Sequence, residues 1–149
     1  MNAAKLPPVL AQLGYAGLLP FFALAIGAWW VPPEWRADVQ RALVTYGAVI
    51  VTFLGAVHWG VGLAQSSTNP LIYVWGITPS LLAWFATLLP AQFGGLLLSV
   101  SLIVCWVVDR RVLQGQAFAA EYLRLRTRLT FAAWGALVLG RLSLSAAVG

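Results

Sequence analysis

The sequence predicts an all-α integral membrane protein, a single bundle of five transmembrane helices over residues 1–149. Only 9% of the residues are charged and 61% are hydrophobic, whereas soluble proteins carry charge on about a quarter of their residues. The hydrophobic residues also form long runs, and uncharged apolar runs of about 18 residues or more are typical of membrane-spanning helices. A bundle embedded in lipid therefore fits the composition better than a soluble domain.

The five spans follow in order from the apolar runs and from the prolines and polar turns that separate them. Pro32 and Pro33 cannot continue a helix, so the first span ends before them. The polar turn "QSSTNP" separates the second span from the third, and "LPAQFGG" ends the third. The fourth run is short for a bilayer core of about 30 Å, so we extend it back toward Ala91. The expected spans are residues 9–31, 41–64, 71–89, 91–108 and 125–145.

Most of the charge lies in the connection 109–128, "DRRVLQGQAFAAEYLRLRTR". We expect its second half to be an interfacial helix whose arginines reach toward lipid head groups. Short basic loops remain on the cytoplasmic side, so the N-terminus is predicted to be cytoplasmic and the C-terminus outside. The net charge of +5 includes no basic run of the kind that binds nucleic acid, so the predicted partner is the lipid bilayer rather than nucleic acid.

The single histidine lies in the stretch "TFLGAVHWGVG" of the second span. Gly55, His58 and Gly62 share one helix face, and small residues there allow a neighbouring helix to approach closely. We therefore predict that His58 faces the bundle. The favoured interpretation is a neutral histidine bonded to a neighbour or lying near the head groups. A metal or haem ligand, a proton relay and a quinone contact remain alternatives. One histidine is too few for a zinc site, so no metal is predicted and the sequence requires no cofactor.

Several residues at the depth of His58 are candidates to line a pocket beside it. Pro79 leaves a carbonyl free near Trp75, to which His58 could donate a hydrogen bond. The candidate ligand-binding residues are His58, Trp59, Tyr15, Trp75, Thr78, Asn69 and Asp109. The candidate helix-packing glycines are Gly14, Gly17, Gly55 and Gly62.

Two charged residues near span ends have two interpretations each. Asp109 is either a solvated carboxylate beside Arg110 and Arg111, which we favour, or the counter-charge to His58. Arg141 emerges at the outer interface if the fifth helix begins near Leu123, and lies inside the bilayer if it begins near Leu129. We favour the first. The eight tryptophans are interpreted mainly as interfacial belts, with Tyr46 among the residues of the outer belt.

Three stretches resemble a known family. "LGYAGLLPFFAL" (13–24), "YGAVIVTFLGAVHWG" (46–60) and "YLRLRTRLT" (122–130) resemble the domain-of-unknown-function family 3429, also called transmembrane protein 69-like. The resemblance covers nearly the whole chain, and "FLGAVHWG" is its most specific part. It implies a small multi-pass protein of the bacterial or mitochondrial inner membrane, here the bacterial inner membrane, and it implies no activity. The element "PPEW" is also similar to one in tryptophan-rich sensory proteins, which is an analogy of architecture alone.

The sequence contains none of the motifs that would indicate catalysis. It has no glycine-rich phosphate loop, no paired catalytic carboxylates, no serine-histidine-acid set and no Cys-x-x-Cys, so no enzyme is predicted. The leading hypothesis is a non-enzymatic accessory or assembly factor, acting within a larger inner-membrane complex or as a homo-oligomer. The second hypothesis is a binding or sensing module for a planar hydrophobic ligand such as a quinone or porphyrin. The third is a small transporter, which the lack of an internal repeat disfavours.

Overall fold

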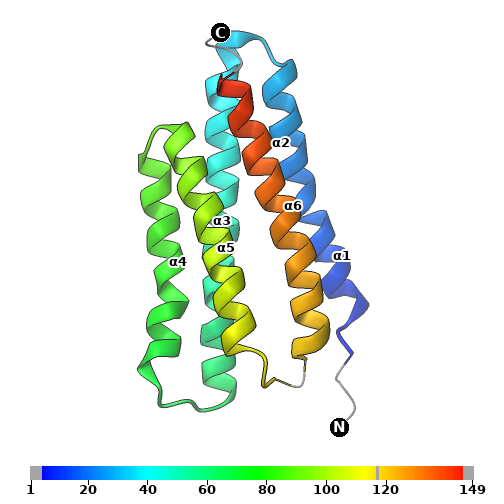
Figure 1. Cartoon of the computed structure of the whole chain (residues 1–149), viewed down its shortest axis with the longest axis vertical. Helices are drawn as coiled ribbons and strands as arrows, with labels where there is room; N and C mark the ends of the chain where they lie inside the picture. The colour runs from blue at the N-terminus through cyan, green and yellow to red at the C-terminus, as the bar shows by residue number, and fades with distance from the viewer. Residues whose placement is uncertain (1–4, 117, 146–149) are drawn as a thin grey trace.

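In a computed structural model, residues 5–116 and 118–145 of the chain are described, and all their regular structure is helical. Figure 1 shows the helices running up and down beside one another, with α1 and α2 following each other along one rod. With residues Pro8–Trp30 taken as one rod, the described helices make a bundle of five rods. The predicted all-α class is confirmed. The helices are α1 (Pro8–Ala16), α2 (Leu18–Trp30), α3 (Pro33–Ala64), α4 (Pro70–Leu88), α5 (Ala91–Val112) and α6 (Ala119–Ser145).

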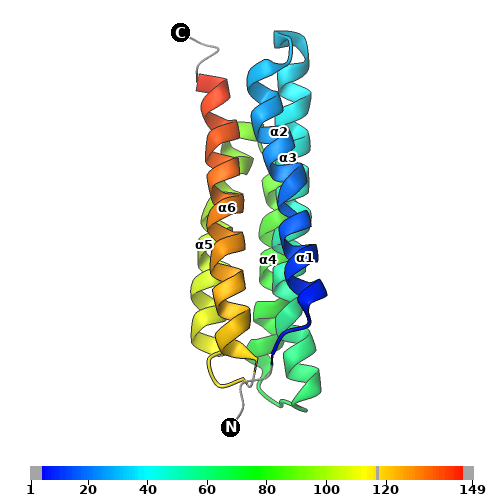
Figure 2. The same cartoon turned by 90° about the vertical axis from the view of Figure 1, so that its right-hand side faces the viewer.

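Four of the rods are long and apolar enough to cross a membrane: α1 with α2, α3, α4 and α5, with mean hydropathy between 1.5 and 2.0. The fifth rod, α6, has 27 residues but contains more charge, including Arg126, Arg128 and Arg141. It nevertheless lies alongside α2 and α5 over most of their length (Figure 2). The chain is therefore a multi-pass membrane protein built as a five-rod helical bundle.

The first predicted span, 9–31, is divided at Gly17 into α1 and α2. Pro20 lacks the N–H that would bond the carbonyl of Ala16, so the helix bends there. Gly17 keeps helical dihedral angles (φ −63°, ψ −16°), and its carbonyl accepts a hydrogen bond of 2.8 Å from the Tyr46 hydroxyl. Because α1 buries none of its residues whereas α2 buries three, the bend leaves α1 at the periphery.

The second span begins earlier than the predicted residue 41, because α3 starts at Pro33. A proline is well suited to the first turn of a helix, since its missing N–H would have no partner there and its φ is already helical. The 32 residues of α3 measure about 48 Å at the usual helical rise, more than a bilayer core of about 30 Å. Tyr46 consequently lies in the middle part of α3, packed edge-on against Phe21 at 5.0 Å, and its assignment to the outer belt is wrong.

Most of the predicted connection 109–128 is helical, including its second half, as the sequence analysis expected. α5 continues past the predicted residue 108 to Val112, and α6 begins at Ala119 rather than near residue 125. Arg110 and Arg111 lie in the last turn of α5, where positive charge favours helix over loop because it complements the helix dipole. This continuation places Asp109 inside the helical bundle instead of in a polar loop.

The glycines of α3 allow α4 to pack very closely against it. A Cβ at Gly55 would lie 2.5 Å from the carbonyl oxygen of Gly76, and one at Gly62 would lie 3.1 Å from the ring of Tyr73. Small residues permit such close approach of helix backbones in membranes. α3 also contacts α2, α5 and α6, so it is the central helix of the bundle and fixes the position of His58.

The two ends of the bundle carry different parts of the chain. The backbone N–H of Leu6 donates a hydrogen bond of 2.8 Å to the Glu121 carboxylate, so the start of α1 lies beside the start of α6. α6 ends at the opposite end of the bundle (Figure 1). The end with the α5–α6 connection is called the basic end below. Its assignment to the cytoplasm stays a prediction.

Candidate functional site

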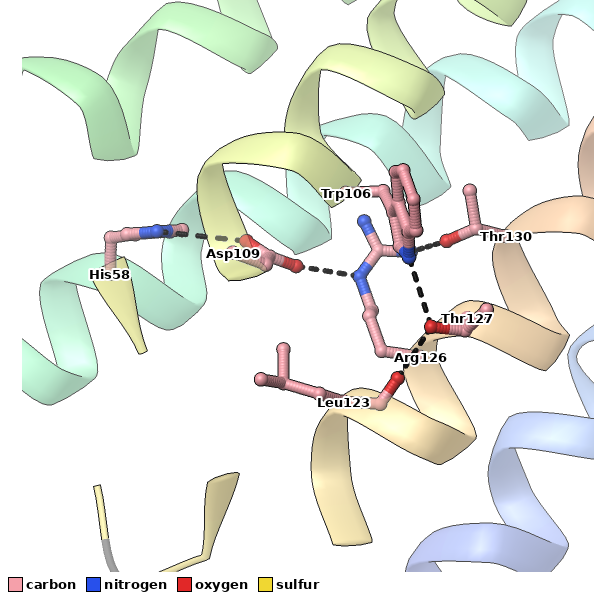
Figure 3. A network of polar contacts seen from close by, with 7 residues as sticks. All are labelled: His58, Trp106, Asp109, Leu123, Arg126, Thr127 and Thr130. Atoms are coloured by element: carbon pink, nitrogen blue, oxygen red, sulfur yellow. Dashed lines mark hydrogen bonds and ion pairs between the residues drawn. The ribbon is translucent and has the colours of Figure 1, made fainter. Parts of the chain in front are cut away.

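A charged cluster is buried inside the bundle, one to three turns from the basic end. It joins His58 of α3, Asp109 of α5, and Arg126 and Thr130 of α6, and each of these residues is at most 4% exposed. Nε of Arg126 donates to Oδ2 of Asp109 at 2.7 Å, and Nη1 of Arg126 donates to the Thr130 hydroxyl. Figure 3 shows His58, Asp109 and Arg126 lying in one row across three helices. These four residues are called the charged cluster.

His58 lies at the α4 side of the charged cluster. Its Nε2 is 3.6 Å from Oδ1 of Asp109, an electrostatic contact slightly beyond hydrogen-bond range. The edge of Trp75 packs against the imidazole, with the ring centroids 6.3 Å apart. Of the predicted candidates, the structure therefore brings His58, Trp75 and Asp109 together.

Four polar side-chain atoms of the charged cluster have no hydrogen-bond partner among residues 5–116 and 118–145. They are Nδ1 and Nε2 of His58, Oδ1 of Asp109 and Nη2 of Arg126, and all four are buried. The predicted hydrogen bond from His58 to a neighbouring group, such as the carbonyl near Trp75, is therefore not formed. Burying such groups is costly, and buried polar groups in native proteins are nearly always satisfied. A buried guanidinium nitrogen without a partner is therefore available to bind an external acceptor.

A second set of hydrogen bonds fixes α5 to α6 beside the charged cluster. The indole N–H of Trp106 donates to the Thr127 hydroxyl at 2.9 Å, and this hydroxyl donates to the Leu123 carbonyl at 2.7 Å (Figure 3). The Trp106 ring also contacts Phe131 edge-on at 5.4 Å. These contacts hold the helices that carry Asp109 and Arg126 in a fixed register.

Asp109 is not the solvated carboxylate that the sequence favoured, because it is only 1% exposed. Arg126, expected to reach toward the head groups, is buried as well. The helical period could have identified Arg126, since its spacing from the apolar residues that follow places it on the inward face. This buried face of α6 comprises Arg126, Thr130, Ala133, Leu137 and Ser143.

A cavity of about 360 Å³ adjoins the Arg126 end of the charged cluster. Aliphatic and aromatic side chains of α1, α2, α3 and α6 form most of its wall, and Arg126, Thr130 and Tyr122 also line it. Two wall residues, Leu13 and Phe53, are 66% and 67% exposed. Because these helices cross the membrane, the cavity reaches the lipid-facing surface between α1 and α3.

The remaining predicted ligand-binding residues lie apart from this cavity. Trp59 is 45% exposed, and its indole N–H donates to the Tyr73 carbonyl. Tyr15 is 44% exposed on α1. The Thr78 hydroxyl donates to the Val74 carbonyl of its own helix, and the Asn69 side chain accepts from the Leu71 N–H as the N-cap of α4. The structure assigns local structural contacts to these two polar side chains.

The two glycines predicted on the first span line the cavity. A Cβ at Gly14 would lie 2.7 Å from Cδ1 of Leu129, and one at Gly17 would lie 3.3 Å from the Gly14 carbonyl oxygen. Gly14 therefore lets α1 approach α6 at the cavity wall.

A separate polar contact joins α3 to α6 at the other end of the bundle. The Gln40 side chain is 2% exposed, and it donates to the Gly140 carbonyl and to the Ser143 hydroxyl. Arg141 is exposed one turn before the end of α6, as expected for a helix that begins at or before Leu123. The sequence analysis did not identify Gln40, which lies between the charged residues Asp38 and Arg41 in the sequence.

Comparison with known proteins provides a family and no biochemical role. No solved structure matches the chain. "Transmembrane protein 69" of Xenopus tropicalis is 37% identical over 87 residues, which are 55% of this chain and 33% of the frog protein. The chain thus matches about a third of the length of this relative. The family described as "Protein of unknown function (DUF3429)" matches residues 6–142, and because this match covers most of the sequence, the chain belongs to that family.

Proposed function

We propose that the chain is a non-enzymatic accessory protein of the membrane that binds a lipophilic carbonyl compound, of the quinone kind, in the cavity beside the charged cluster. The observation that carries the proposal is the Nη2 atom of Arg126, a buried donor without a partner among the described residues. It belongs to a side chain that lines a mostly apolar cavity. A ligand with an apolar body and one acceptor oxygen complements both features.

The charge balance favours a neutral acceptor over an anion. The carboxylate of Asp109 contacts the Arg126 guanidinium at 2.7 Å and offsets its charge. A carbonyl oxygen accepts a hydrogen bond from Nη2 without adding a charge to this site, whereas a carboxylate ligand would be repelled by Asp109. The hydrogen bond to a charged donor contributes about 1.5–3 kcal/mol.

The same contacts argue against a porphyrin held by His58. His58 does not line the cavity, and its Nε2 faces Asp109. The exposed positions of Leu13 and Phe53 at the cavity wall support entry of the ligand from the lipid rather than from water. This route suits a carrier dissolved in an inner membrane, the location that we propose for the protein.

Binding of a benzoquinone with a decyl tail to the detergent-purified protein tests the proposal. Native mass spectrometry gives the bound fraction across a titration. Arg126→Lys keeps a positive charge for Asp109 but removes the guanidinium fork, so affinity is expected to fall about 10-fold or more, equivalent to about 1.4 kcal/mol. Val57→Phe narrows the cavity and is expected to weaken binding, whereas Val49→Phe on the lipid-facing surface of α3 is the matched control.

Decylbenzene, which lacks carbonyl oxygens, is the control ligand. Equal binding of decylbenzene and the quinone would show that Arg126 does not recognise the head group. Equal quinone affinity in the Val57→Phe and Val49→Phe proteins would show that the ligand lies outside the cavity. Either result would overturn the proposed function.

A further inference from the structure

Three arginines line one surface groove between α5 and α6 at the basic end. Arg110, Arg124 and Arg128, together with Gln114, border a cavity of about 460 Å³ whose lining contains no carboxylate. All three arginines are exposed. No salt bridge found among residues 5–116 and 118–145 involves any of them. This groove, called the arginine cradle, therefore concentrates positive charge that the described part of the chain does not offset.

Packing of α5 against α6 brings these three positive charges close together, and their mutual repulsion is unfavourable. Arg124 and Arg128 are four residues apart on α6, where like charges repel. Glu121, three residues before Arg124, accepts a hydrogen bond from the Leu6 backbone and forms no salt bridge in the described structure. The Arg110 guanidinium lies over the Trp106 ring, 5.2 Å from its centroid, which fixes its position at the cradle. An anion bound between these groups would relieve their repulsion.

A second and largely apolar groove, called the apolar groove, lies between the same two helices, farther from the basic end than the arginine cradle and beyond the contact between Trp106 and Phe131. Its cavity of about 400 Å³ is bordered mainly by apolar side chains, among them Val100, Ile103 and Val104 of α5 and Trp134 and Val138 of α6, and also by Ser99 and Arg141. On α5, Ile103 precedes Arg110 by seven residues, about two helical turns, so these two side chains lie on the same helix face. The ten residues from Val100 to Arg110 span about 15 Å, about half the thickness of a bilayer core. An acyl chain whose phosphate occupies the arginine cradle would therefore reach the apolar groove within one leaflet.

We propose that the α5–α6 groove is a binding site for an anionic membrane phospholipid, with its phosphate in the arginine cradle and an acyl chain in the apolar groove. Guanidinium groups bind phosphate oxygens through paired, charge-assisted hydrogen bonds. The uncompensated positive charge favours a lipid with net negative charge over a zwitterionic lipid, whose head group also carries a cation. The residues that line this site include none of the charged cluster, and the site does not depend on the proposed carbonyl ligand.

Native mass spectrometry of the delipidated full chain in mild detergent tests this site. The probes are phosphatidylglycerol and phosphatidylcholine with identical acyl chains. Phosphatidylglycerol is expected to bind at least 10-fold more tightly. Arg124→Gln/Arg128→Gln is expected to weaken its binding about 10-fold, whereas Arg41→Gln/Arg111→Gln, which removes two exposed arginines outside the cradle, is expected to change it less than twofold. Circular dichroism confirms that both variants remain folded.

Two further measurements distinguish a lipid site from a site for free phosphate. Val104→Trp fills the apolar groove and is expected to weaken phosphatidylglycerol binding, and millimolar inorganic phosphate is expected not to displace the lipid. Displacement by phosphate, together with unchanged binding to Val104→Trp, would indicate a phosphate site and overturn the proposal. Equal affinity for the two lipids, or equal losses in the two double variants, would overturn it as well.

Discussion

Replacing Asp109 with asparagine tests whether the charged cluster is a buried ion pair. The change leaves the Arg126 guanidinium, which is 4% exposed, without the carboxylate that it contacts at 2.7 Å. At a charge separation of about 4 Å and an effective dielectric constant of about 20, the lost attraction is about 4 kcal/mol. Breaking one side of a buried pair usually costs about 3–5 kcal/mol, so we expect Asp109→Asn to lower the free energy of unfolding by about 4 kcal/mol.

Arg126→Met should cost less than Asp109→Asn, because the remaining carboxylate still lies 3.6 Å from Nε2 of His58. The double variant replaces the pair without leaving a buried guanidinium. It should therefore recover most of the stability, as buried ion pairs replaced by neutral groups often do. The expected coupling energy between the two positions is about 3 kcal/mol.

Reversible unfolding in mixed micelles, followed by tryptophan fluorescence, measures the free energies of the wild type, the two single variants and the double variant. Arg124→Met, which removes an exposed arginine two residues away, is the control and should change stability by less than about 0.5 kcal/mol. If Asp109→Asn costs less than about 1 kcal/mol, the value of solvent-exposed pairs, or if the two substitutions are additive, then the buried ion pair does not exist as described.

Three further predictions concern packing, the bend in the first rod, and topology. Gly55→Ala should destabilise the bundle by about 1–3 kcal/mol, because the added methyl group would meet the backbone of α4. Gly60→Ala is the control and should be neutral or stabilising, because a Cβ at Gly60 would have nothing within 4 Å. Equal effects of the two substitutions in thermal unfolding would contradict close α3–α4 packing. Tyr46→Phe removes the hydrogen bond to the bend between α1 and α2 and should cost about 1 kcal/mol in the same unfolding assay, and no loss would show that the bond is not needed. Gln114→Cys in a Cys105→Ala background should react with an impermeant maleimide only from the cytoplasmic side, and labelling from outside would reverse the predicted orientation.

The membrane class and the number of rods follow from the sequence because they depend on local composition. A run of apolar residues long enough to cross the bilayer must become a helix, since lipid offers no partner for backbone polar groups. Helix ends were less accurate where charge was interpreted as loop. Hydrophobicity alone predicted that α5 ends at residue 108. The arginines after Asp109 extend this helix to Val112, because a basic last turn stabilises a helix.

Only the tertiary structure decided what the charged residues contact. From the sequence, Asp109 and Arg126 are both parts of a basic connection, and His58 lies 51 positions before Asp109. Their association depends on the register between α3, α5 and α6, which is set by close packing of side chains and by the Trp106–Thr127 hydrogen bond. One residue of shift along α6 would turn Arg126 by about 100°, away from Asp109 and toward lipid. A helical period predicts which face points inward, but only the packed neighbours determine the partner on that face.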